Sequence, residues 1–222
     1  MLYDAFLFDL DGTLINTQSV DFLIHRELLG AFGYELTQST YASVFGQTRP
    51  EMIKNLLHGA GDPCNLETYM EHYVPRLESD LRTHSTLLVT GAVELCKSFY
   101  IHGIPIALVT SSPRSVLAHI TNLEPLLPLF STTITADDVT NRKPHPEPFL
   151  KASSTLDVMH PFIFEDSLPG ILAANRAGIP FATHRHSANT SALNIAQTLP
   201  RFQFAFDDYN APQIQEFLEQ IP

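Results

Sequence analysis

The chain has 222 residues, of which 44% are hydrophobic and 17% charged, and its formal net charge is −11 at pH 7. This length is enough for one α/β domain or for a core domain with a smaller insertion. The acidic balance argues against general binding to nucleic acid or to an anionic membrane surface, because both favour a basic face on the protein. A small anionic ligand must therefore meet local positive charge.

Cysteine usage and apolar runs indicate the compartment. The two cysteines, Cys64 and Cys96, follow no metal-binding spacing, so we expect free thiols in a reducing, cytoplasmic environment. The apolar start, residues 2–10, contains acidic residues and lacks a basic leader region, which favours a first strand over a signal peptide. No apolar run is long enough to span a membrane, and no membrane partner is expected.

The first predicted element is a short apolar strand that ends in acidic residues. Residues 6–14 read Phe-Leu-Phe-Asp-Leu-Asp-Gly-Thr-Leu. Asp9 and Asp11 are two residues apart, so in an extended segment both side chains project to the same side. Two carboxylates in one small site indicate either Mg²⁺ or a division into one charged group and one proton donor. A hairpin turn is the usual alternative for an isolated Asp-Gly pair.

The next stretch, residues 19–82, predicts helices. Glycine and proline interrupt it, and residues 21–32 carry apolar side chains at helical spacing. We expect an all-helical cap domain over residues 16–85, inserted into a core domain of residues 1–15 and 86–222. The polar connections at 16–17 and 82–86 would let the cap close over the core as a lid.

Predicted strands and helices alternate from about residue 87 onward. Strands are expected at 104–109, 132–135, 161–164, 180–182 and 203–206, and helices at 92–100, 146–154, 169–177, around 192 and at 213–219. Gly178 stands where the helix at 169–177 should end, because glycine adopts the left-handed conformation of a helix C-terminus. The alternation predicts an α/β fold, a doubly wound parallel sheet with helices on both faces.

Polar side chains follow the apolar runs, at the sheet edge where ligands of open parallel sheets bind. They are Asp9 and Asp11; Thr110, Ser111 and Ser112; Lys143; and Glu165 and Asp166. Carboxylates can hold Mg²⁺, hydroxyls with backbone N–H groups can bind a phosphate, and one lysine can neutralise the remaining charge. Taken singly, these residues are also ordinary helix caps and surface residues. Their shared place at one edge favours a reaction centre.

In this order, the motifs resemble those of the haloacid dehalogenase superfamily, specifically members with a helical cap after the first motif, such as β-phosphoglucomutase and small-metabolite phosphatases. The matching segments are residues 9–13, 107–112, 142–144 and 164–167, the last followed by glycines and alanines at 170–178. The resemblance covers essentially the whole chain. It implies a Rossmann-like core of the kind predicted above, with the cap inserted after the first strand.

The resemblance also implies a role for each matching residue in the reaction. Asp9 would be the nucleophile that forms an aspartyl-phosphate, and Asp11 would protonate the leaving oxygen and later activate water. Thr110 and the Ser111 amide would bind the transferring phosphoryl group, and Lys143 would offset the negative charge around the nucleophile. Such a set suits phosphoryl transfer, which needs mainly positioning and charge neutralisation.

A Mg²⁺ site is implied by the same resemblance. The ion would be held by the Asp9 carboxylate, the Asp11 main-chain carbonyl and Asp166, with Glu165 either a direct ligand or a partner of the ligands. The expected substrate is a small phosphorylated metabolite, such as a sugar phosphate. A monomer is expected, because the cap already shields the site.

The expected reaction type follows from positions at which this chain differs from family members with other activities. Asp11 favours a phosphate ester, since dehalogenases and phosphonatases lack this aspartate. Mutase members have a histidine at the position of Asp21 and an aspartate at that of Asn16, so both positions favour a phosphatase with water as acceptor. Arg49 stands where mutases place a substrate-binding arginine, which keeps both a substrate contact and a phosphomutase open; a solvated side chain is the alternative. A binding or regulatory relative is a third class.

Other conspicuous side chains are expected to be structural. His184 and His186 form a His-x-His pair with no cysteine or carboxylate close in sequence, which favours a solvated loop over a metal site. Arg76 and Arg82 are expected to solvate a helix face. Packing within the cap is the interpretation for Phe22, Leu23, Tyr69 and Tyr73.

Overall fold

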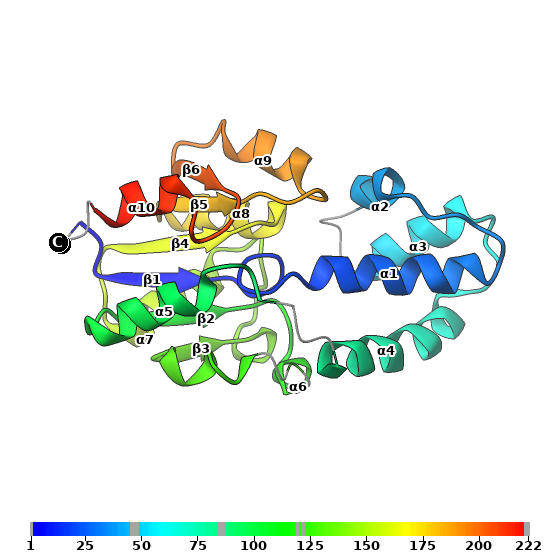
Figure 1. Cartoon of the computed structure of the whole chain (residues 1–222), viewed down its shortest axis with the longest axis horizontal. Coiled ribbons are helices and arrows are strands. Elements are labelled where there is room, and N and C mark those ends of the chain that lie inside the picture. Colours follow the sequence, from blue (N-terminus) through cyan, green and yellow to red (C-terminus); the bar gives the residue numbers. More distant parts are fainter. Residues whose placement is uncertain (1, 45–48, 84–87, 119, 121–122, 220–222) are drawn as a thin grey trace.

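The computed structural model describes residues 2–44, 49–83, 88–118, 120 and 123–219. The strands are β1 (Ala5–Phe8), β2 (Ile106–Val109), β3 (Thr132–Ile134), β4 (Pro161–Glu165), β5 (Phe181–His184) and β6 (Phe202–Phe206). They form one parallel sheet in the order β3-β2-β1-β4-β5-β6 (Figure 1). The predicted doubly wound parallel sheet is confirmed. The first strand lies at its centre, between β2 and β4.

Helices cover both faces of this sheet. They are α5 (Ala92–Ile101), α6 (Arg114–Leu117), α7 (Glu147–Leu156), α8 (Leu168–Ala177), α9 (Thr190–Ala196) and α10 (Pro212–Leu218), with short 3₁₀ turns η2 (Leu127–Leu129) and η3 (Ala136–Asp138). Phe6 and Phe8 pack in one apolar cluster with residues of α5 and α10, whereas Leu7 packs in the other with residues of α7, α8 and α9. Since successive strand side chains point to opposite faces, β1 is buried on both.

Helix α8 shows how local sequence sets the element ends beside the strand edge. The Ser167 hydroxyl accepts a hydrogen bond from the Gly170 amide, so Ser167 caps the N-terminus. Gly178 follows the last turn with φ 73°, which confirms the predicted glycine stop. The helix therefore begins directly after the acidic pair that closes β4.

Four helices form a separate group beyond the end of β1 (Figure 1). They are α1 (Thr17–Gly30), α2 (Gln38–Val44), α3 (Arg49–Gly59) and α4 (Leu66–Thr83). The helical character predicted for this part of the chain is confirmed, although α1 begins two residues before the predicted helical stretch of residues 19–82. Residues 84–87 lie outside the described residues, and so does most of the predicted hinge at 82–86. The boundary of the cap at 16–85 remains a prediction.

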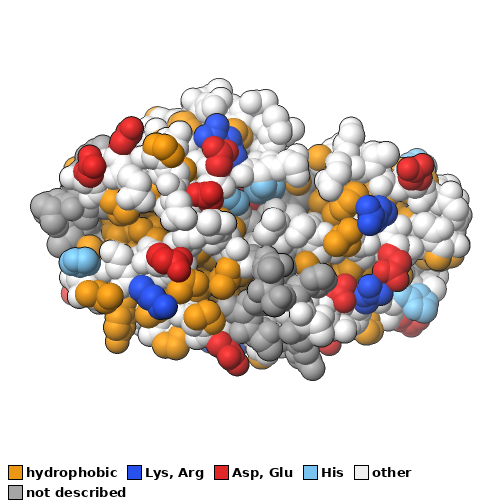
Figure 2. Space-filling model, in the orientation of Figure 1, with side chains coloured by type: hydrophobic (Ala, Val, Ile, Leu, Met, Phe, Trp, Pro, Cys, Tyr) orange, Lys and Arg blue, Asp and Glu red, His pale blue; other side chains and the backbone are white. Residues whose placement is uncertain are grey.

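The surface agrees with the acidic composition. On the face shown in Figure 2, described Lys and Arg side chains are scattered and form no continuous basic patch. The outline is indented between the sheet-containing part and the cap helices. No helix of the described chain is both long enough and apolar enough to cross a membrane.

Candidate active site

The sheet register places Asp9 in the middle of the ligand-binding edge. Phe8 is level with Leu108 of β2 and with Phe164 of β4. The next residue on each strand is therefore Asp9, Val109 or Glu165, and all three emerge at the same edge because the strands are parallel. β1 lies between β2 and β4, where the strand order of the sheet reverses. Open parallel sheets bind ligands beyond the strand ends at such a point.

Lys143 joins these strand ends. Its Nζ lies 2.5 Å from Oδ1 of Asp9, 2.8 Å from Oε1 of Glu165 and 2.9 Å from the main-chain oxygen of Val109. The side chain is 2% exposed. Burial opposes the charged ammonium, but Asp9 and Glu165 outweigh it and raise the pKa of Lys143. The lysine is thus a fixed positive charge against the Asp9 carboxylate.

The Asp9 carboxyl is strongly influenced by its surroundings. Burial raises its pKa, Lys143 lowers it, and the nearby carboxylates of Glu165 and Asp166 raise it again. A group in this position needs compensating positive charge to stay ionised. The site therefore favours a cation in addition to the lysine.

Glu165 is fully engaged by protein donors. Its Oε2 accepts hydrogen bonds from the amides of Asp166 and Ser167 at 2.7 Å and from the Ser167 hydroxyl at 3.0 Å, while its Oε1 accepts from Lys143. A Cβ at Gly170 would overlap this carboxylate, so only glycine fits there. Glu165 holds the lysine and the turn that carries Asp166.

Asp11 lies beside Asp9 in a different setting. Its Oδ1 accepts a hydrogen bond from the Thr17 hydroxyl at 2.9 Å, and its Oδ2 accepts one from the Ser112 hydroxyl at 3.0 Å. A hydroxyl can donate to a carboxylate or accept from a carboxylic acid. Thr17 and Ser112 can therefore orient Asp11 in both protonation states.

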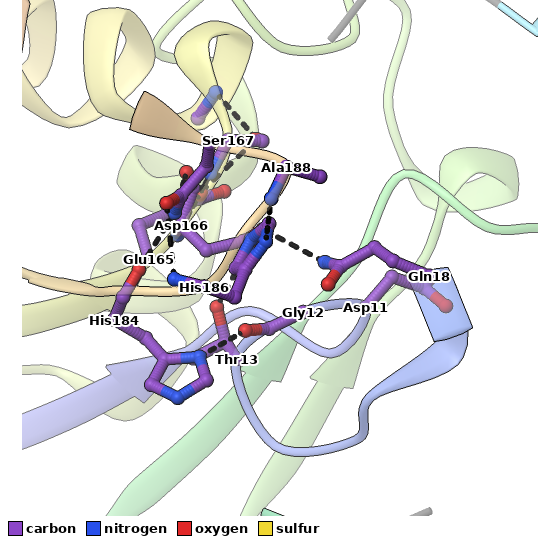
Figure 3. A network of polar contacts seen from close by, with 12 residues as sticks. Asp11, Gly12, Thr13, Gln18, Glu165, Asp166, Ser167, His184, His186 and Ala188 are labelled. Atoms are coloured by element: carbon purple, nitrogen blue, oxygen red, sulfur yellow. Dashed lines mark hydrogen bonds and ion pairs between the residues drawn. The ribbon is translucent and has the colours of Figure 1, made fainter. Parts of the chain in front are cut away.

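Asp166 is held by three side chains from distant parts of the sequence, which Figure 3 shows converging. Thr13 donates to its Oδ1 at 3.1 Å, and Gln18 donates to its Oδ2 at 3.1 Å. His186 Nε2 lies 2.8 Å from the same Oδ2. Gly12 has φ 87°, and a Cβ there would overlap Gln18 and Asp166. The loop after β1 thus packs directly on Asp166.

Three of these carboxylates form a group with the spacing of a cation site. Oxygen atoms of Asp9, Glu165 and Asp166 lie within 4.8 Å of one another, and all three residues are buried. Burial, followed by the charge of Glu165, raises the pKa of Asp166. An all-oxygen set with several acidic members suits a hard cation such as Mg²⁺.

The solvated-loop interpretation of the histidine pair is wrong. His184 is buried, with ring nitrogens 2.6 Å from the Gly12 carbonyl oxygen and 2.9 Å from that of Asp207. Burial lowers the pKa of His186 to about 4. Its Nδ1 accepts from the Ala188 amide, so the neutral ring donates through Nε2 to Asp166. His184 is the last residue of β5 and His186 follows it, so the strand-edge rule used for the other residues would have found them.

The phosphate-binding candidates follow β2. Thr110 is buried, and its hydroxyl accepts from the Ser112 amide at 3.0 Å, which tightens the turn after the strand. Ser111 is exposed and lines a cavity of about 740 Å³ together with Asp9, Asp11 and Lys143. Thr110 is not among the described residues that line it. Ser111 is thus better placed than Thr110 to meet a ligand.

Arg49 lines the same cavity from the cap, within a polar cluster. Asp21 accepts hydrogen bonds from Tyr41, at 2.7 Å, and from Tyr73; the Arg49 guanidinium bonds the Tyr73 hydroxyl and lies 3.7 Å from Asp21. Burial alone would raise the pKa of Asp21, but His25 and Arg49 outweigh burial and hold it below its usual range. Arg49 is therefore a partnered residue of the cavity wall, even though its side chain is 46% exposed.

The remaining candidates give a mixed outcome. Arg76 pairs with Glu27 and Asp80 on the cap surface, as expected for a helix-solvating residue. Phe22, Tyr69 and Tyr73 are buried as predicted, but Leu23 is 41% exposed, so its predicted packing role is wrong. Cys64 and Cys96 are free thiols, as predicted. The Arg82 side chain lies outside the described part of the chain.

Comparison with known proteins identifies relatives along most of the chain. It is 32% identical to the validoxylamine A 7′-phosphate phosphatase of Streptomyces hygroscopicus subsp. limoneus, over 80% of this chain and 84% of the relative. Identity to the phosphorylated carbohydrates phosphatase of Thermotoga maritima is 31%, over 79% and 82%. Identity to the bifunctional riboflavin kinase/FMN phosphatase of Arabidopsis thaliana is 28% over 98% of this chain, which spans only 59% of that protein.

A solved structure supports the same fold. The crystal structure of β-phosphoglucomutase from Clostridium difficile matches with a TM-score of 0.70 and 22% identity, over 98% of this chain and 96% of the other. At this identity the match shows the fold alone. A family model of haloacid dehalogenase-like hydrolases matches residues 6–184, which include Asp9, Asp11, Lys143, Glu165 and Asp166. The chain belongs to the haloacid dehalogenase-like hydrolases.

Proposed function

We propose that this protein is a Mg²⁺-dependent phosphatase that hydrolyses a small phosphorylated metabolite through an aspartyl-phosphate on Asp9. Family membership and the phosphatase relatives make the chain a hydrolase of phosphoric monoesters. One observation supports the mechanism most directly. The Asp9 carboxylate lies in the cavity wall against the buried ammonium of Lys143, with Asp11 lining the same cavity.

The first half of the reaction transfers the phosphoryl group to the protein. An oxygen of the Asp9 carboxylate bonds to phosphorus while the ester P–O bond breaks. Asp11 gives its proton to the leaving oxygen, which departs as an alcohol. The Ser111 amide and the turn after β2 bind the phosphoryl oxygens, and Lys143 offsets the charge that gathers around Asp9.

The second half releases inorganic phosphate. Asp11 takes a proton from a water molecule whose oxygen bonds to phosphorus, and the bond between phosphorus and the Asp9 oxygen breaks. Asp9 returns as a carboxylate and Asp11 as an acid, so the cycle closes. Thr17 and Ser112 keep Asp11 oriented in both halves, because their hydroxyls suit either protonation state.

Asp9, the Asp11 main-chain carbonyl and Asp166 would hold Mg²⁺. When bound, the ion supplies positive charge that offsets the carboxylates and the phosphate. Glu165 is assigned an indirect role, since both of its oxygens already accept hydrogen bonds from Lys143 and the 166–167 turn. Its part is to hold the lysine and Asp166 in place.

Water is the proposed acceptor of the phosphoryl group. A phosphomutase must keep Asp11 from activating water until an acceptor sugar binds, and the mutase resemblance associates that restraint with a histidine at the position of Asp21. Here Asp21 is bound to two tyrosines and to Arg49. This supports the hydrolase and leaves the mutase as the second candidate.

The test is release of inorganic phosphate from 4-nitrophenyl phosphate. The wild type should require Mg²⁺ and lose activity with a chelator, and Asp9→Asn should stay folded while its rate falls by about 10⁴-fold or more. Mg²⁺-independent release, or substantial activity in Asp9→Asn, would contradict the mechanism. No release from any ester would favour a binding protein, and isomerised hexose phosphate forming faster than free phosphate would favour a mutase.

A further inference from the structure

The two oxygens of the buried Asp166 carboxylate have different surroundings. Gln18 and His186 both donate to Oδ2, at 3.1 Å and 2.8 Å, whereas Thr13 alone donates to Oδ1, at 3.1 Å. An ionised carboxylate has about four lone-pair sites, shared equally by its oxygens. Among the hydrogen bonds of the described residues, the two donors therefore fill Oδ2, and one lone-pair site is left on Oδ1.

None of these three donors brings a positive charge to the carboxylate. The threonine hydroxyl and the glutamine amide are uncharged. The His186 ring is neutral, because its Nδ1 accepts a hydrogen bond from the Ala188 amide at 3.3 Å and so carries no proton. Lys143, the cation of the site, bonds the other two carboxylates of the group instead. Within the described part of the chain, Asp166 is therefore oriented by neutral hydrogen-bond donors alone.

Both donors to Oδ2 are held in place by the fold. Gln18 is buried in the first turn of α1 and lines the core end of the cavity, where Asp9 and Lys143 lie. A Cβ at Gly12 would overlap the Gln18 amide, so the loop after β1 packs directly against this contact. The His186 side chain is 11% exposed. Donors that are fixed in this way also fix the direction in which the carboxylate points.

We propose that Gln18 and His186 are positioning residues for cation binding. They hold Oδ2 of Asp166 through neutral donors, so that Oδ1 and the negative charge of the carboxylate are left for Mg²⁺. Loss of either donor should weaken Mg²⁺ binding, because partners that orient a metal ligand are typically worth about 10- to 100-fold in affinity. This role rests on the Mg²⁺ site of the phosphatase proposed above, but ion binding can be measured without turnover.

Gln18→Met tests the donor from the cap. Methionine has nearly the length of glutamine but no N–H group, so the dissociation constant of Mg²⁺ should rise by about tenfold or more. Calorimetric titration of the full chain with MgCl₂, without substrate, measures this constant. Gln38→Met is the matched control, because it makes the same exchange at an exposed position at the start of another cap helix, α2. The control should stay within about twofold of the wild type.

Three substitutions of His186 separate hydrogen bonding from packing and from charge. His186→Phe keeps a ring without a donor and should raise the Mg²⁺ dissociation constant by about tenfold or more. His186→Gln supplies a neutral amide donor and should restore most of the affinity. His186→Lys supplies a charged donor that pairs with Asp166 and competes with the ion, so it should bind Mg²⁺ about tenfold more weakly than His186→Gln.

The outcomes separate the positioning role from the activity. Wild-type Mg²⁺ affinity in Gln18→Met and His186→Phe would overturn the role, and so would equal losses in all three variants of His186. Mg²⁺-dependent phosphate release by the wild type would leave the phosphatase standing in either case. If the wild type binds Mg²⁺ and the variants without a donor bind it more weakly, the role stands even where no ester is hydrolysed. A wild type that binds no Mg²⁺ overturns both proposals.

Discussion

The core end and the cap end of the cavity are built in different ways. At the core end, Asp9 and Glu165 lie at the ends of the adjacent strands β1 and β4, so the sheet register sets their geometry, and Lys143 binds both directly. At the cap end, Asp21 and Arg49 meet because separate helices pack together. A change at the core end therefore disturbs the chemistry, whereas a change at the cap end alters what is bound or how stable the cap is.

The largest effect is expected from removing Asp11, the proposed acid and base at the core end. Asp11→Asn should lower turnover by about 10²- to 10⁴-fold, because an amide cannot exchange the proton. The loss should be larger for an alkyl phosphate than for 4-nitrophenyl phosphate, whose leaving group needs less protonation. Asp80→Asn is the control on the cap surface and should keep the wild-type rate. Equal losses with both substrates would argue against proton donation by Asp11.

A methyl group in the core should have the next largest effect. Gly170→Ala places a Cβ where the Glu165 carboxylate lies, so Glu165 must shift away from Lys143 and the 166–167 amides. We expect kcat to fall by roughly 10²-fold, the scale of a small misplacement of catalytic groups. The melting temperature should fall as well. Steady-state kinetics and thermal unfolding measure both, and wild-type values would show that Glu165 does not position the site.

Asp21→Asn should act on the stability of the cap and depend on pH. The pKa of Asp21 is depressed in the folded protein, so its contribution is present above the ordinary aspartate pKa of about 4 and is lost as the pH falls below that value. At pH 7 the variant should be less stable by about 2 kcal/mol. Chemical unfolding between pH 7 and pH 3 should show the difference shrinking, and a constant difference would contradict the charged cluster.

The smallest effect is expected from a glycine-to-alanine substitution in the cap. Gly30→Ala adds a Cβ that meets no atom within 4 Å, at a helical position. It should stabilise the protein by about 0.5 kcal/mol and leave kcat unchanged, since alanine loses less backbone entropy on folding. Thermal unfolding beside Gly170→Ala checks this contrast. A loss of activity in Gly30→Ala would show that the cap end also sets the chemistry.

The sequence predicts the residues at the core end of the cavity better than those at the cap end, for a physical reason. Apolar runs fixed the strands, and polar residues after them had to share one edge, so Asp9, Lys143 and Asp166 could be placed together in advance. The contact of Gln18 with Asp166 could not, because it depends on where α1 begins and how it packs. His186 could have been predicted in the same way, because it also follows an apolar strand, β5.

The polar cluster in the cap could not be predicted in this way. Asp21, Tyr73 and Arg49 come from three helices, and no periodicity tells which faces of different helices meet. In the sequence, Asp21 stood out only because mutases have a histidine there, and Arg49 only because mutases have an arginine there. The predicted domain boundary and the hinge at 82–86 stay predictions, since most of that connection lies outside the described residues.

The position of β1 at the centre of the sheet limits when the site can form during synthesis of the chain. Asp9, the proposed nucleophile, precedes Lys143 by 134 residues, and the Thr13–Asp166 bond joins residues 153 apart. The cap helices, by contrast, are complete by residue 83. A nascent chain that has grown only through the cap therefore carries Asp9 without any of its strand-end partners. The proposed site can therefore form only after β4 has been made and has paired with the earlier strand β1.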